Sequence, residues 1–94
     1  MAADEDNDWE IFIYRGGRAP EHVTHARIDE SVYEIIEDAF NNCKENLLTV
    51  ETHDGIRIFG YGAFIGCKYL RRMNLKSAVE IDGWAFSMCE NLRQ

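Results

Sequence analysis

The chain has 94 residues, of which 17 are acidic and 10 are basic, so its formal net charge is −7 at neutral pH. A chain of this length forms one domain and buries only about 60–65% of the surface that its unfolded form exposes. Its hydrophobic fraction of 46% is too high for a chain that is disordered throughout. No apolar run approaches the roughly 20 residues that a membrane helix needs, and the first residues are acidic. We therefore expect a cytoplasmic protein without a membrane partner.

The N-terminal part of the chain predicts a tail followed by a strand. Residues 1–8 are acidic and are expected to form a flexible tail. Residues 9–14 are rich in aromatic and β-branched side chains, and Gly16-Gly17 follows them, which favours a strand. We expect this strand to cap the open end of the repeats that follow, so that residues 9–31 hold an N-terminal cap and a first repeat strand.

A repeated motif dominates the rest of the chain. The pattern A-F-x-x-C occurs at residues 39–43, 63–67 and 85–89, and a leucine follows each cysteine after three or four places. Cys43, Cys67 and Cys89 therefore recur at a nearly constant interval. This period predicts repeats at residues 32–54, 55–78 and 79–94, the last of them truncated, within a domain that spans residues 9–94.

The apolar spacing inside one unit indicates short strands and turns. In stretches such as Leu47-x-x-Val50-x-Thr52 the later positions are two apart, which suits a strand with one buried face. A turn near Asp54-Gly55 returns the chain, and A-F-x-x-C is expected to turn its Phe and Cys inward. One unit is too small to bury these side chains alone, so we expect successive coils to stack as a solenoid.

The threefold A-F-x-x-C motif and its following leucines resemble BspA-like leucine-rich repeats over residues 20–94. The extra residue before Leu47 and the threonine at position 52 depart from that pattern. The resemblance implies an α/β fold: a right-handed leucine-rich-repeat solenoid of about three and a half short coils, built mainly from short parallel strands and turns. It also implies a recognition or scaffold module that is not an enzyme and needs no cofactor.

The exposed positions of the predicted strands are the candidate contact surface for a protein or peptide. A regularly spaced row of polar side chains suits recognition, although it is also what a merely solvated face would look like. The rival interpretation is a purely structural repeat segment that extends a longer array or self-associates through an uncapped C-terminal end. The nine candidate positions are His25, Arg27, Asp29, Thr49, Glu51, His53, Arg72, Asn74 and Lys76.

One basic repeat lies between acidic ones. Residues 1–31 and 32–54 each carry a net charge of −5, residues 55–78 carry +5 with no acid, and residues 79–94 carry −2. Aligning the repeats places Arg27 beside Glu51, and such cross-strand pairs fix which repeat neighbours which. Five basic residues between strongly acidic repeats make a poor phosphate footprint, so no nucleic-acid partner is expected.

The remaining chemistry-bearing residues favour structural roles. Three cysteines without a C-x-x-C pair argue against a disulfide framework, and we expect them to form a buried ladder. His22, His25 and His53 are expected away from the thiols, so no metal site is predicted. The glycines of residues 60–66 read G-x-G-x-x-x-G, one residue too long for a dinucleotide fingerprint, and are interpreted as a repeat turn.

Overall fold

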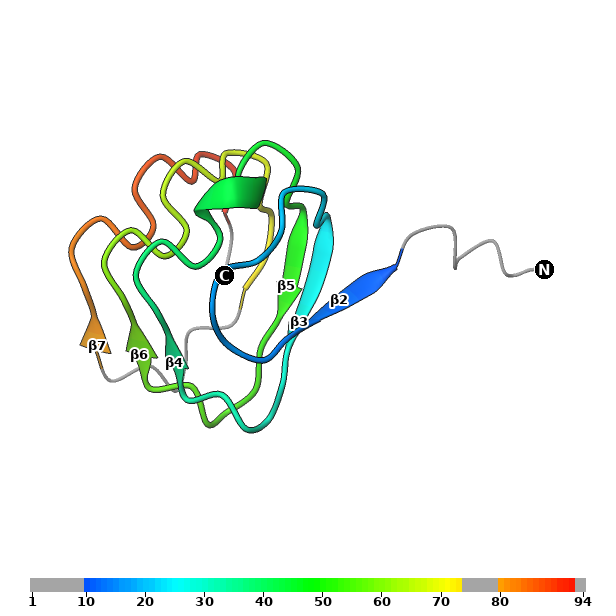
Figure 1. Cartoon of the computed structure of the whole chain (residues 1–94). Coiled ribbons are helices and arrows are strands. Elements are labelled where there is room, and N and C mark those ends of the chain that lie inside the picture. Colours follow the sequence, from blue (N-terminus) through cyan, green and yellow to red (C-terminus); the bar gives the residue numbers. More distant parts are fainter. Residues whose placement is uncertain (1–9, 74–79, 93–94) are drawn as a thin grey trace.

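The computed structural model describes residues 10–73 and 80–92, which form two sheets of short parallel strands (Figure 1). One sheet has the strand order β2-β3-β5 and the other has the order β4-β6-β7. The tail expected at residues 1–8 lies outside the described residues. The strands are β2 (Ile11–Tyr14), β3 (His25–Ile28), β4 (Glu34–Ile35), β5 (Thr49–Glu51), β6 (Ile58–Phe59) and β7 (Glu80–Ile81).

Helical structure is almost absent from the described part of the chain. Within residues 10–73 and 80–92 it is limited to one 3-10 helix, η1 (Asn41–Cys43). The helical component of the expected α/β class is therefore reduced to a single turn, because short strands and tight turns leave no stretch long enough for an amphipathic helix. The described residues contain no helix with the length and apolar character needed to cross a bilayer.

The strand register follows the period of the sequence. In the first sheet His25 pairs with Thr49, which holds the equivalent position one repeat later. In the second sheet Ile35 pairs with Phe59, and Phe59 pairs in turn with Ile81. Each strand from β3 onward thus lies beside its counterpart in the next repeat, as the spacing of the cysteines predicts.

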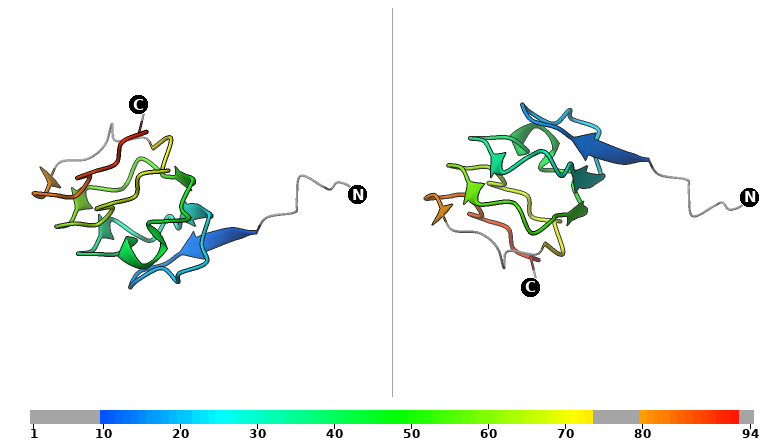
Figure 2. Two further views of the ribbon diagram at one scale, coloured as in Figure 1. Left: turned by 90° about the horizontal axis from the view of Figure 1, so that it is seen from above. Right: turned by 90° about the horizontal axis from the view of Figure 1, so that it is seen from below.

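The motif phenylalanines form the centre of the core. The rings of Phe40 and Phe64 are stacked with centroids 4.7 Å apart, and those of Phe64 and Phe86 are stacked at 5.3 Å. Phe40 and Phe64 are fully buried, and Phe86 is partly buried. Figure 2 shows the successive turns that carry these residues lying one above another. The apolar core is therefore continuous from repeat to repeat, as stacking of units too small to fold alone requires.

The start of the A-F turn has the same backbone geometry in each repeat. Asp38, Gly62 and Trp84 occupy equivalent positions, and all three have positive φ angles between 58° and 67°. The next residue, an alanine, donates its N–H to the carbonyl three residues earlier in every copy. The glycine run at residues 60–66 is thus a repeat turn, as interpreted from the sequence.

Backbone hydrogen bonds also join these turns to one another. The motif alanine of each repeat accepts a hydrogen bond from the preceding turn: Ala39 from the N–H of Ala19 at 2.8 Å, Ala63 from Phe40 at 2.9 Å and Ala85 from Phe64 at 2.8 Å. We call these three bonds the alanine ladder. It connects the repeats at the side of the fold that has little strand structure.

The N-terminal strand β2 extends the first sheet and covers the first repeat. Ile11 pairs with His25 and Tyr14 with Ile28. The buried Tyr14 ring lies 5.0 Å from that of Phe40, and its hydroxyl donates to the Gly17 carbonyl at 2.7 Å. Tyr14 therefore continues the stack of aromatic rings beyond the first A-F motif.

Candidate binding face on the first sheet

The outer side of strands β3 and β5 holds the polar positions predicted from the sequence. We use "strand face" for the seven of these positions that are described. Asn74 and Lys76 lie outside the described residues. The strand face consists of His25, Arg27, Asp29, Thr49, Glu51, His53 and Arg72.

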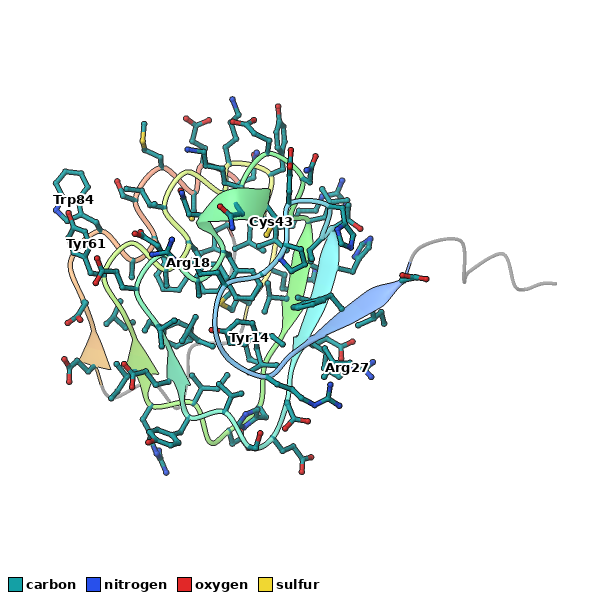
Figure 3. All side chains as sticks on the ribbon, viewed as in Figure 1. Tyr14, Arg18, Arg27, Cys43, Tyr61 and Trp84 are labelled. Carbon is teal, nitrogen blue, oxygen red and sulfur yellow. The ribbon has the colours of Figure 1, made fainter. Side chains whose placement is uncertain are left out.

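Two cross-strand pairs lie at the centre of the strand face. A 2.7 Å hydrogen bond joins His25 Nδ1 to Thr49 Oγ1. The Nε of Arg27 donates to Glu51 Oε1 at 2.7 Å, and both side chains are at least half exposed. Figure 3 shows Arg27 projecting away from the body of the fold, on the side of the first sheet. The pairing of Arg27 with Glu51 expected from the sequence is confirmed.

The two cross-strand pairs form two rows of the strand face, and a third row consists of Asp29 and His53. Hydrogen bonds to backbone groups hold His53 in place. His53 Nε2 lies 3.0 Å from the Asp29 carbonyl oxygen, and His53 Nδ1 lies 2.9 Å from the backbone nitrogen of Gly55. The Gly55 N–H donates to Nδ1, so Nε2 carries the proton and donates to Asp29. The Asp29 carboxylate accepts from the hydroxyl and the N–H of Ser31, and these bonds lower the pKa of that carboxyl. Asp29 and His53 are thereby fixed just beyond the strands.

Arg72 lies at the far edge of the strand face. An isolated bridge joins it to Thr49, so the segment around residue 72 runs parallel to β5. Its side chain is exposed. The strand face thus consists of three rows, and each row runs across consecutive repeats. Together the rows present hydrogen-bond donors, acceptors and charges of both signs.

The basic repeat, residues 55–78, makes an ion pair and backbone hydrogen bonds with its neighbours. Lys68 Nζ lies 4.0 Å from Glu45 Oε1, and Glu90 lines the same surface hollow. The Arg57 N–H donates to the Tyr33 carbonyl, and the Arg57 carbonyl accepts from the N–H of Glu80. The basic repeat therefore contacts repeats on both of its sides.

An apolar row, not predicted from the sequence, lies beside the polar ones. Ile11 and Ile13 on β2 pair with His25 and Arg27 and extend the strand face by one strand. A hollow of about 470 Å³ lies along this strand and is lined partly by both isoleucines. The alternation of Ile11 and Ile13 with Phe12 and Tyr14 was the available signal, since residues two apart share one face of a strand.

The cysteines are placed away from the strand face. Cys43 and Cys67 are fully buried, Cys89 is partly exposed, and all three are free thiols. Burial raises the pKa of Cys43 to about 11 and also raises the pKa of Cys67 and Cys89. The Sγ atoms of Cys43 and Cys67 both lie near the Phe40 carbonyl, at 3.5 and 3.8 Å. The predicted ladder of inward thiols is confirmed for the first two cysteines and is partly open at the third.

Metal ligands do not cluster in the part of the chain that the structure describes. There, no group of three or more His, Cys, Asp or Glu side chains has a geometry that would hold a metal ion. Within the strand face, His25 and His53 instead bond to Thr49 and to backbone groups. These bonds hold the two imidazole rings in fixed positions.

Comparisons with known proteins agree with the repeat pattern. The family model described as BspA type leucine rich repeat region (6 copies) matches residues 20–94, which is most of the chain. Comparisons with curated proteins and with solved structures gave no match. The resemblance drawn from the A-F-x-x-C motif is therefore confirmed.

Proposed function

Because the chain belongs to the BspA-type leucine-rich repeat family, we propose that it is a non-catalytic protein-binding or scaffold module. In this proposal the two sheets are the sides of a right-handed solenoid of about three and a half coils. The strand face is its recognition surface for a protein or peptide. Nucleic acid and membranes are not among its proposed partners.

The observation that carries the proposal is the alignment of three polar rows across consecutive repeats. Register pairs His25 with Thr49 and Arg27 with Glu51, and Thr49 with Arg72. Hydrogen bonds hold several of these side chains in place before any ligand arrives, which lowers the entropy lost on binding. A rigid grid of exposed polar groups favours recognition of an extended partner.

A binding selection tests this proposal. Peptides selected from a random library against the wild-type chain should bind at least tenfold more weakly to Glu51→Arg and to Arg72→Glu. The matched control is Glu37→Arg, since Glu37 is exposed and follows β4 of the other sheet. Selected peptides that bind all of these variants equally would place recognition elsewhere on the molecule.

The second candidate function is a structural repeat segment that self-associates through its last repeat. Core positions of the last repeat are more exposed than their counterparts in the earlier repeats, and this supports the second candidate. Ile81 is 49% exposed, whereas its counterparts Ile35 and Phe59 are at most 1% exposed. Phe86 and Leu92, at core positions of the same repeat, are only partly buried. Another repeat, from this chain or a second copy, would cover these side chains.

Sedimentation equilibrium separates the two candidates. If the second one holds, the apparent mass rises with protein concentration, and Ile81→Lys returns it to that of a monomer. Glu37→Lys provides a control substitution at an exposed position outside the last repeat. A monomeric mass over the whole concentration range would count against self-association.

The proposal also includes a cytoplasmic location. The three cysteines are free thiols, and thiols persist in reducing compartments. If protein is isolated without reductant and then denatured, three thiols per chain should react with a thiol reagent. Fewer than three would point to an oxidising compartment.

A further inference from the structure

A hollow at the far edge of the first sheet carries two positive charges. It has a volume of about 480 Å³. The Arg71 N–H donates to the Leu48 carbonyl at 3.0 Å, and Asn91 of the last repeat also lines the hollow, so three consecutive repeats form its walls. Figure 2 shows the yellow segment that ends at residue 73 running beside β5. The lining residues are Leu48, Tyr69, Arg71, Arg72 and Asn91.

The charge of this hollow is not neutralised locally. Its described lining contains no aspartate or glutamate. Over residues 10–73 and 80–92, no carboxylate oxygen lies within 4.0 Å of the guanidinium groups of Arg71 or Arg72, whereas Arg27 and Lys68 have such partners. In a chain with a net charge of −7 this is a local reversal of sign.

A neighbouring group responds to this charge. Burial, and after it the positive charge of Arg71, lower the pKa of His25. Arg71 therefore lies close enough to the strand face to act on the His25 ring.

The other lining groups match a peptide. The Tyr69 ring is 45% exposed, and the half-buried Leu48 adds an apolar wall. Asn91 Nδ2 donates to the Lys68 carbonyl at 2.6 Å, while its Oδ1 has no hydrogen-bond partner among the described residues. That oxygen is available to accept a hydrogen bond from a peptide N–H.

We propose that this hollow binds a carboxylate side chain of an acidic peptide segment, with Arg71 and Arg72 as its cationic ligands. Guanidinium groups bind carboxylates through paired, charge-assisted hydrogen bonds. The inference rests on the proposed function, because Arg72 belongs to both surfaces, and it names the chemistry of the partner. A nucleic acid fits less well, since the repeats before residue 55 carry strong negative charge and would repel a long polyanion.

Fluorescence anisotropy with a labelled hexapeptide that contains three glutamates tests the inference. The wild-type chain should bind it, and the affinity should fall as salt rises. The Arg71→Gln and Arg72→Gln double variant should bind about tenfold more weakly. The single variants Arg71→Gln and Arg72→Gln should each bind more weakly than the wild type, and Arg18→Gln is their matched control. Arg18 is exposed, lies outside the hollow and has no carboxylate partner among the described residues. A peptide with glutamine in place of glutamate should not bind.

Three results would overturn the inference. They are no binding of the glutamate peptide, equal weakening by Arg18→Gln, and stronger Arg71- and Arg72-dependent binding of a single-stranded DNA oligonucleotide. Circular dichroism of each variant confirms that it is folded. If the glutamate peptide fails but selected peptides still depend on Glu51, only this inference is wrong. If it binds through Arg71 and Arg72 while selected peptides ignore Glu51, the strand-face proposal is wrong instead.

Discussion

Two residues of the last repeat hold a backbone conformation that suits glycine. Trp84 and Met88 have φ angles of 67° and 63°, and the equivalent positions of the preceding repeat are Gly62 and Gly66. A left-handed conformation costs a residue with a Cβ roughly 1–2 kcal/mol. Both side chains are more than 60% exposed, so burial does not offset this cost. In Figure 3 Trp84 lies at the edge of the molecule.

Relieving this strain should stabilise the fold. We expect Trp84→Gly to be about 1 kcal/mol more stable than Trp84→Ala, because only alanine retains the left-handed strain. Urea unfolding followed by circular dichroism measures the difference. Gly62→Ala should lower the free energy of unfolding, because it introduces the left-handed strain and its added Cβ would also lie 2.9 Å from Asp38 Oδ1. An alanine variant at 84 as stable as the glycine variant would contradict the strain.

The three thiols should differ in reactivity. Only the thiolate reacts with iodoacetamide, and burial both raises the pKa of Cys43 to about 11 and shields its sulfur. Cys67 is equally buried, whereas Cys89 is partly exposed. Mass spectrometry of the native protein should find Cys89 labelled first. Labelling of Cys67 at the rate of Cys89 would refute the buried ladder.

The lowered pKa of His25 predicts a loss of stability in mild acid. The folded state disfavours the protonated ring relative to the unfolded state, where the pKa is about 6.5. Stability is therefore fully present above this value and declines as the pH falls from it toward the lower folded pKa. Unfolding midpoints measured from pH 7.5 to 5 should fall less for His25→Gln than for the wild type. The same slope in both proteins would show that His25 does not contribute.

At the scale of elements, the stack of phenylalanine rings predicts a gradient of mutational cost. Phe64 packs against Phe40 on one side and Phe86 on the other, and is fully buried. Phe64→Ala should lose about 3–5 kcal/mol, and Phe86→Ala clearly less because its ring is partly exposed. The milder pair Phe64→Leu and Phe86→Leu gives the same comparison if the alanine variant does not fold. Equal losses measured in urea would contradict a stack centred on Phe64.

The repeat period predicted most strand pairings but not the shape of every turn. Counting forward from His25 by the spacing between Cys43 and Cys67 reaches Thr49, its partner in the sheet, without any structural information. The first A-F turn differs from the others because one extra residue precedes Leu47, and η1 forms there where the second repeat has the left-handed Gly66. Whether an insertion forms a helical turn or a bulge depends on packing, which the spacing does not encode.

The parts of the candidate surface that the sequence did not predict lie outside the period. Ile11 pairs with His25, which follows it by much less than one full repeat, so comparison of repeats gives no register for β2. Leu48 and Asn91 line the same hollow although they come from different repeats and from different positions in them. Such a site depends on the relative placement of repeats in three dimensions, whereas the rows of the strand face depend only on the count.

At the scale of the whole molecule, the charge pattern orders the repeats more than it stabilises them. The Arg27–Glu51 pair is exposed on both sides, and such pairs contribute only about 0–1 kcal/mol. Buried aromatic rings and parallel backbone bonds hold the stack together, while the surface charges lie outside that core. Substitutions of exposed charged residues are thus expected to change binding affinity while changing the free energy of unfolding little.

The alanine ladder has a consequence for how such a chain changes length during evolution. Each bond of the ladder joins one repeat to the next through main-chain atoms, with the alanine of the following turn as acceptor. Duplication or loss of one whole repeat by recombination therefore recreates the same junction. The ladder also accepts small differences in repeat length, because Phe40 bonds to Ala63 and Phe64 bonds to Ala85 although the second pair is closer in the sequence. The protein can therefore gain or lose whole repeats during evolution, because each added repeat forms the same kind of interface as the existing ones.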